Sequence, residues 1–71
     1  MFFGTLLHVE PSAVGEVYFE FVQVGQQMRV SAIDADTNTE VVIIAPVAAT
    51  RTQMQTVALA KLRRKLEQAK G

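Results

Sequence analysis

Two kinds of hydrophobic spacing follow one another along this chain. In short runs such as EVYFEFVQV, residues 16–24, apolar side chains recur at alternate positions. A period of two is typical of β-strands, because successive side chains point to opposite faces of the sheet. The pattern predicts three strands, over residues 16–24, 28–35 and 40–45. A second pattern, with spacings of three and four, predicts one helix over residues 51–69.

Turn-forming residues separate the three predicted strands. Gly25 and Gln26 follow the first strand, and glycine at the first central position favours a type II′ turn. A longer turn spans residues 34–40, where Asn38 is the residue best suited to a left-handed backbone conformation. Pro46 lacks the N–H that a sheet ladder requires and therefore ends the third strand. These connections predict an antiparallel meander.

The expected register divides the sheet into two faces. We pair Val24 with Gln27 across the first turn and Ile33 with Val41 across the second. A shift of one residue would exchange the faces of a strand. One face is then wholly apolar and is the predicted core: Phe19, Phe21, Val30, Ala32, Val42 and Ile44. The other face is half apolar: Tyr18, Glu20, Val22, Arg29, Ser31, Ile33, Val41 and Ile43.

The helix has a start signal and one apolar stripe. Thr50, followed three residues later by Gln53, forms a capping-box pattern. The apolar residues that follow lie on one side of a helix. They are Met54, Val57, Ala58, Leu62, Leu66 and Ala69, with Leu59 at the edge. This stripe is expected to cover the wholly apolar face, which gives an α+β fold with the order β-β-β-α.

Residues 1–15 allow two interpretations. Five of the eight residues after Met1 are large and apolar, which favours a short edge strand from Thr5 to Val9, because such side chains are costly to leave in water. Interrupting glycine, proline and serine residues instead favour a tail or leader. Residues 16–71 form the single small domain in either case.

Length and composition restrict the class of protein. The chain has 71 residues, 49% hydrophobic and 20% charged, which predicts a folded domain. So small a hydrophobic core contributes about 3–5 kcal/mol to the free energy of unfolding, and the chain has no cysteine that could form a disulfide. A homodimer or a protein partner is therefore expected. No segment approaches the roughly 20 apolar residues of a membrane span, and the N-terminus lacks the basic region of a secretory signal, which predicts a cytoplasmic protein without a membrane partner.

Charge is divided between the two ends of the chain. Residues 1–49 carry six acids and one base, whereas residues 50–71 carry six bases and one acid. Four bases gather in the predicted helix: Lys61, Arg63, Arg64 and Lys65. Bases near a helix C-terminus are favoured by the helix dipole and aid solubility. The same four residues are the candidate contacts for nonspecific nucleic-acid binding, because phosphate requires positive charge.

The sequence contains no recognisable motif for catalysis or metal binding. A single histidine and no cysteine cannot build a zinc site. The acidic loop, residues 34–40, lacks the spacing and central glycine of an EF-hand. Four polar side chains share the half-apolar face: Tyr18, Glu20, Arg29 and Ser31. Such a cross-strand group is ordinary sheet surface, and a flat face is a poor cleft. We expect a protein that is not an enzyme and has no catalytic, cofactor or metal site.

Several segments between residues 16 and 66 resemble a known family. EVYFEF, VSAIDADTNTEV, AP and LAKLRRKL together are similar to short alphaproteobacterial proteins of unknown function. The AID…T..EV hairpin is the most specific of these segments. Asn38 stands where that family usually has the glycine of the turn. The family is uncharacterised, so the resemblance implies no catalytic or binding residue.

The half-apolar face leads to a functional hypothesis. More of it is apolar than a solvated surface needs, so we expect a protein-interaction module that self-associates or binds a protein partner there. The candidate interface residues are Tyr18, Val22, Ile33, Val41 and Ile43. If the N-terminal segment folded over this face instead, the protein would be a monomer. The alternative function is nucleic-acid binding through the basic helix.

Overall fold

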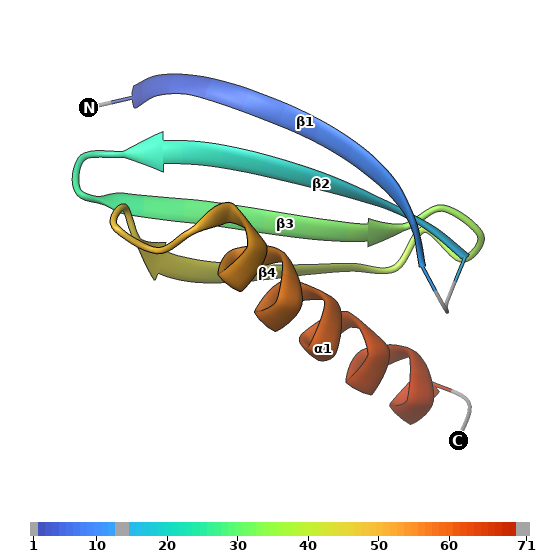
Figure 1. Cartoon of the computed structure of the whole chain (residues 1–71). Helices are drawn as coiled ribbons and strands as arrows, with labels where there is room; N and C mark the ends of the chain where they lie inside the picture. Colours follow the sequence, from blue (N-terminus) through green and yellow to red (C-terminus); the bar gives the residue numbers. More distant parts are fainter. Residues whose placement is uncertain (1, 13–14, 70–71) are drawn as a thin grey trace.

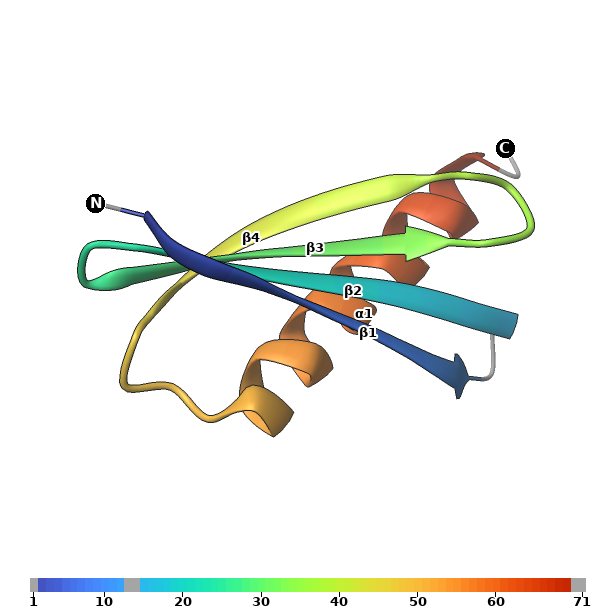
Figure 2. The ribbon, with the colours of Figure 1, turned by 90° about the horizontal axis from the view of Figure 1, so that it is seen from above.

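The computed structural model describes residues 2–12 and 15–69, which form one antiparallel sheet with a helix on one face (Figure 1). The elements in chain order are β1 (Phe2–Ser12), β2 (Gly15–Val24), β3 (Gln27–Asp34), β4 (Glu40–Pro46) and α1 (Arg51–Ala69). The strands keep this order in the sheet, and α1 crosses them obliquely (Figure 2). The predicted β-β-β-α fold is confirmed, with a further strand at the N-terminus.

The N-terminal segment is an edge strand. β1 pairs antiparallel with β2, from Phe2 opposite Val24 to Ser12 opposite Gly15, with a register shift between Phe2 and Thr5. The strand is therefore longer than the Thr5–Val9 segment expected from sequence. Its backbone lies beside β2 (Figure 1), so it widens the sheet and does not cover either face.

β2 and β3 pair in the predicted register. Val24 lies opposite Gln27, and Phe21 lies opposite Val30. Gly25 has a φ of 60°, and Gln26 has no positive φ, as a type II′ turn requires. The two-residue turn leaves a single way to align the strands, which explains why this hairpin could be predicted.

Asp34 organises the turn between β3 and β4. Its Oδ2 atom accepts hydrogen bonds from the Thr37 hydroxyl at 2.7 Å and from the Thr37 N–H at 3.0 Å. The Asp34 N–H donates to the Thr39 carbonyl at 2.8 Å, and the Asn38 N–H donates to the Asp34 carbonyl at 2.8 Å. Asn38 has a φ of 63°, which confirms the left-handed conformation predicted for it.

We expect Asn38→Ala to lower the free energy of unfolding by about 1–2 kcal/mol, because alanine has no local side-chain hydrogen bond to offset a left-handed backbone. Asn38→Gly should change it by less than about 1 kcal/mol, since glycine adopts this conformation readily. Urea denaturation measures both values. The control is Ala35→Gly, in the same loop but without a positive φ, where glycine should only destabilise. Equal losses for both glycine variants would contradict the prediction.

The register between β3 and β4 is one residue away from the predicted one. Ile33 lies opposite Glu40, and Ala32 lies opposite Val41, whereas we paired Ile33 with Val41. The cause is the turn. Because Asn38 adopts a left-handed backbone, the loop ends at the hydrogen bond between Asp34 and Thr39. The predicted register would instead place Glu40, the next residue, opposite Asp34.

This change exchanges the faces of β4. Val41 and Ile43 pack against the helix side, and Val41 is only 5% exposed. Val42 and Ile44 occupy the opposite face, where Ile44 is 59% exposed. The prediction of Val42 and Ile44 as core residues is therefore wrong, and so is the placement of Val41 and Ile43 on the half-apolar face.

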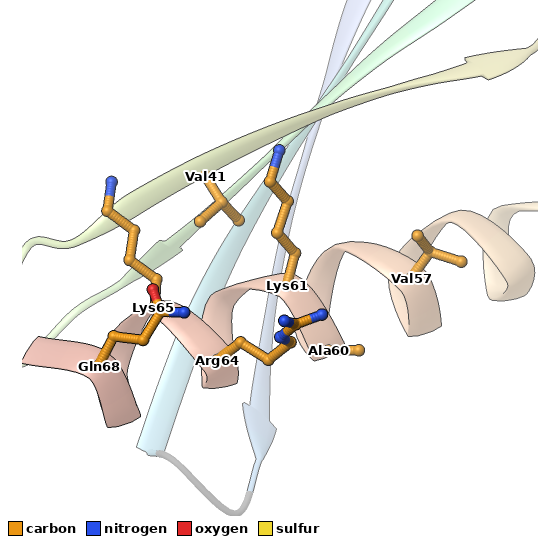
Figure 3. A pocket seen from close by; sticks show the side chains of 7 residues that line it. All are labelled: Val41, Val57, Ala60, Lys61, Arg64, Lys65 and Gln68. Carbon is orange, nitrogen blue, oxygen red and sulfur yellow. The ribbon is translucent and has the colours of Figure 1, made fainter.

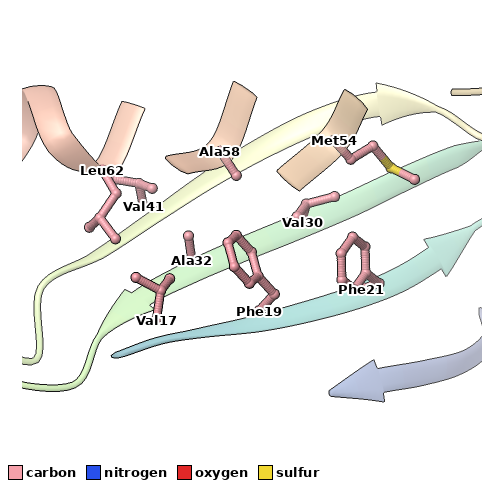
Figure 4. Close-up of a cluster of buried hydrophobic side chains, with 9 residues drawn as sticks. All are labelled: Val17, Phe19, Phe21, Val30, Ala32, Val41, Met54, Ala58 and Leu62. Carbon is pink, nitrogen blue, oxygen red and sulfur yellow. The ribbon is translucent and has the colours of Figure 1, made fainter. Parts of the chain in front are cut away.

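The hydrophobic core lies between α1 and the sheet (Figure 4). The β2 and β3 positions Phe19, Phe21, Val30 and Ala32 are buried, as predicted. The rings of Phe19 and Phe21 stack with centroids 6.3 Å apart. The complete cluster is Val17, Phe19, Phe21, Val30, Ala32, Val41, Met54, Ala58 and Leu62.

The helix begins where its sequence predicts, but the side that faces the sheet differs slightly from the predicted apolar stripe. The capping box forms, because the Gln53 N–H donates to Thr50 Oγ1 at 3.1 Å and the Thr50 N–H donates to Gln53 Oε1 at 2.9 Å. The buried positions of α1 are spaced by four: Met54, Ala58 and Leu62. Val57, which the predicted stripe included, is 56% exposed because this spacing turns it away from the sheet.

Candidate functional surfaces

The face of the sheet opposite α1 is the first candidate surface. Among the described residues, no helix or strand lies over it (Figure 2). Residues directly opposite one another in a sheet share a face, so the pairing defines this surface, which we call the open face. From β2, β3 and β4 it comprises Tyr18, Glu20, Val22, Val24, Gln27, Arg29, Ser31, Ile33, Glu40, Val42, Ile44 and Pro46.

Large apolar side chains are exposed on the open face. Tyr18 is 41% exposed, Val24 is 49% exposed and Ile44 is 59% exposed. Val22 and Val42 are half-buried on the same face. The apolar residues therefore reach from one end of this face to the other and are not confined to a single strand.

Polar residues divide the apolar surface. Val22, Arg29 and Ile44 form one row across the strands. In the next row Ser31, between Glu20 and Val42, is small and only 3% exposed. The face thus combines exposed apolar groups with charges of both signs.

The candidate interface residues are only partly brought together. Tyr18, Val22 and Ile33 lie on the open face, as predicted. Val41 and Ile43 lie on the other side, and the exposed apolar residues of this face that the candidate set omitted are Val24 and Ile44. The sequence signal that could have predicted the exposure of Ile44 is the pair of turn residues Asp34 and Asn38, because these residues set the register of β4 against β3.

The free edge of β4 is the second candidate surface. β4 is the last strand of the sheet, so one side of its backbone has no neighbouring strand. Two helix lysines reach this side: Lys61 Nζ donates to the Val42 carbonyl at 2.8 Å, and Lys65 Nζ donates to the Glu40 carbonyl at 2.9 Å. Charged side chains placed on a strand edge hinder edge-to-edge aggregation.

A groove of about 460 Å³ runs between this edge and the exposed flank of α1 (Figure 3). Val57 and Ala60 give it an apolar part, and its basic residues come from the same helix. Among the described residues that line it, there is no acid. The lining residues are Val41, Val57, Ala60, Lys61, Arg64, Lys65 and Gln68. We call this surface the basic groove.

The four candidate nucleic-acid contacts do not form one patch. Lys61, Arg64 and Lys65 line the basic groove, whereas Arg63 does not. Each helical residue turns the side chain by about 100°, so Arg63 lies roughly 200° around the helix from Lys61. The sequence cluster is therefore divided between two sides of α1.

The helix dipole does not account for these bases. The last turn of α1 in the described chain contains no base, and the dipole effect falls off within that turn. Lys61 and Lys65 instead hydrogen-bond to backbone carbonyls of β4, which are distant in sequence.

The described part of the chain has neither a cluster of metal ligands nor a helix that could span a membrane. No three His, Asp or Glu side chains there group closely enough to hold a metal ion. Within the same residues, α1 is not long and apolar enough to cross a membrane. The open face and the basic groove remain as candidate functional surfaces.

Comparison with known proteins places the chain in a family. A family model described as a domain of unknown function, DUF6898, matches residues 14–69. The match extends from the start of β2 to the end of α1 and so includes the hairpins and the helix described above. No curated protein and no solved structure matches the chain. The protein therefore belongs to the DUF6898 family, a domain of unknown function.

Proposed function

We propose that this protein is a non-catalytic protein-interaction module whose open face binds a second copy of the chain. The observation that carries the proposal is the exposure of Tyr18, Val24 and Ile44 on a sheet face that no described helix or strand covers. Several large apolar side chains exposed on one face of a small protein, with polar residues among them, are typical of an interaction site. The face of a sheet suits another flat protein surface better than a small ligand, which usually binds in a concave site.

The small size of the core supports self-association. One helix packs against one face of the sheet, so the domain has a single hydrophobic layer. Domains of this size usually need a further source of stability, and oligomerisation is one such source. Packing two open faces together would bury Ile44 and its neighbours and add a second apolar layer.

The charges of the open face are compatible with a symmetric pair. Glu20 and Arg29 lie in adjacent rows of the face and carry opposite charge. In a two-fold dimer, a contact between one residue of the first copy and another residue of the second copy is repeated with the two copies exchanged. Glu20 of one copy can therefore face Arg29 of the other, and the reverse contact forms automatically.

Light scattering of the purified chain at micromolar concentration tests this proposal. We expect a mass twice the 7.8 kDa of the monomer. Ile44→Asp should convert the protein to a folded monomer, because it places a charge among the apolar residues of the proposed contact. Val57→Asp is the matched control: Val57 is 56% exposed, close to the 59% of Ile44, but lies on α1 and should leave the dimer intact.

A monomer mass for the wild-type chain would contradict self-association. A dimer that persists in Ile44→Asp but is lost in Val57→Asp would place the contact on the helix and would also contradict the proposal. Circular dichroism of both variants checks that they remain folded, so that a change of mass is not mistaken for unfolding.

Nucleic-acid binding has weaker support. Two of the four candidate ammonium and guanidinium groups, those of Lys61 and Lys65, already donate to carbonyls of β4. Arg63 lies outside the basic groove. Phosphate recognition gains from several bases on one surface, and this helix divides them between two sides.

A further inference from the structure

We propose that the basic groove binds an extended, acidic segment of a partner protein, which adds to the edge of β4 as a fifth strand. This inference concerns a different surface from the open face and does not depend on self-association. Three features carry it: the free hydrogen-bonding groups of β4, the shape of the groove and its charge.

The outer edge of β4 offers a regular ladder of backbone groups. Asp34 and Thr39 form a hydrogen-bonded pair. Because such pairs alternate in an antiparallel ladder, Val41 and Ile43 bond to β3, and the backbone groups of Glu40, Val42 and Ile44 point outward. The lysine contacts agree with this assignment, since they reach the carbonyls of Glu40 and Val42.

Lys61 and Lys65 bond to two of the outward carbonyls but leave the edge of β4 able to pair with another strand. Each ammonium group satisfies a carbonyl, but an ammonium has no acceptor for the outward N–H groups of Val42 and Ile44. The N–H groups of an added strand can replace the ammonium groups, and its carbonyls can accept from β4. Pro46 lacks an N–H, so the ladder ends there.

The helix flank beside this edge has the features of a strand-binding groove. Val57, Ala60, Arg64 and Gln68 recur at spacings of three and four, which forms one stripe along α1. The stripe lies across the groove from β4 (Figure 3). Binding of an extended peptide between an edge strand and a second element is a known recognition mode, in which the backbone supplies affinity and the side-chain positions supply specificity.

Charge identifies the partner. Lys61, Arg64 and Lys65 line the groove, and among the described lining residues there is no acid. The ammonium groups of the two lysines are bonded to neutral carbonyls, so an added strand that takes over those carbonyls frees both lysines to meet carboxylates. A second copy of β4 is a poor occupant, because two-fold pairing of the edges would bring two basic grooves together.

Fluorescence anisotropy with the full chain tests the proposal. The probe is a labelled peptide in which glutamate alternates with valine and threonine. We expect micromolar binding that weakens as salt is added. A peptide with lysine in place of glutamate, and an acidic peptide with proline at its centre, should each bind at least about tenfold more weakly, because the first loses the charge match and the second cannot form the ladder.

Two neighbouring arginines provide matched variants. Arg64→Glu should weaken binding of the acidic peptide at least about tenfold, because Arg64 lines the groove. Arg63→Glu makes the same charge change at an exposed residue outside the groove and should bind the peptide more strongly than Arg64→Glu. Val22→Asp, whose side chain lies on the open face and whose strand, β2, does not border the groove, should retain binding. In NMR spectra, the peptide should shift the amide signals of Val42 and Ile44.

Several outcomes would overturn the proposal. These are equal binding of the acidic, lysine and proline peptides, equal loss in Arg63→Glu and Arg64→Glu, or no acidic-peptide binding at about 1 mM, which is weaker than specific recognition. Binding of a single-stranded RNA oligonucleotide in the absence of acidic-peptide binding would assign the groove to nucleic acid instead.

Discussion

Phe19→Ala is expected to lower the free energy of unfolding by about 3–5 kcal/mol, which is most of the stability of a domain this small. Phe19 is 1% exposed and stacks against Phe21 in the middle of the core. Removing the ring loses its transfer free energy and leaves a cavity that a single helix and sheet cannot close by moving together. The variant should therefore be largely unfolded.

Urea denaturation followed by circular dichroism measures this effect, at one protein concentration for every variant because self-association adds apparent stability. Val24→Ala is the control on the same strand. Val24 is 49% exposed, so its truncation should cost less than about 1 kcal/mol. A Phe19→Ala protein as stable as Val24→Ala would show that α1 does not pack on this face.

Ile43→Asp is expected to lower the free energy of unfolding by about 3 kcal/mol or more, whereas Ile44→Asp should cost about 1 kcal/mol. Ile43 is partly buried against the core, so a carboxylate there loses much of its hydration among apolar side chains. Ile44 is 59% exposed in a single copy of the chain, so a carboxylate there remains in water at protein concentrations low enough to keep the chain monomeric. The two residues are identical and adjacent, and therefore the comparison isolates the face on which each side chain lies.

The outcome of this pair decides the register of β4. Thermal unfolding of the two variants is sufficient, since the expected difference is large. If Ile44→Asp unfolds and Ile43→Asp remains folded, β4 pairs with β3 in the register that we first predicted from sequence. Val42 and Ile44 would then belong to the core, and Val41 and Ile43 to the open face.

Local sequence signals predicted a large part of the fold. The β2–β3 register follows from a two-residue turn with glycine in its first central position. The limits of α1, Arg51 to Ala69, agree with the predicted helix, because the Thr50–Gln53 capping box marks its start. Each of these features depends on residues within a few positions of one another, which is why sequence alone was sufficient.

The second hairpin could not be predicted in the same way. Residues 41–44 are all apolar, so they have no alternation that distinguishes one register from the next. The choice is made by a loop in which Asp34 binds Thr37 and Asn38 adopts a left-handed backbone. Sequence identified these turn residues but not the position at which the loop would close.

The candidate surfaces depended on this choice and on long-range contacts. Exchange of the β4 faces replaced Val41 and Ile43 with Ile44 as the exposed residue of the open face. The basic residues of α1 read as one cluster in sequence, but hydrogen bonds from Lys61 and Lys65 to β4 show that two of them are edge contacts. No local pattern relates these helix residues to that strand.

For this protein, sequence by itself determined the segments of β2, β3, β4 and α1, the first hairpin register and the helix cap, because short-range sterics and hydrogen bonds decide them. Only the tertiary structure decided which face of β4 is buried, and with it which apolar residues remain exposed. It also decided that α1 lies close enough to the β4 edge to form the basic groove. The physical reason is that an all-apolar strand fits either register locally, and only the closed turn and the packed helix favour one.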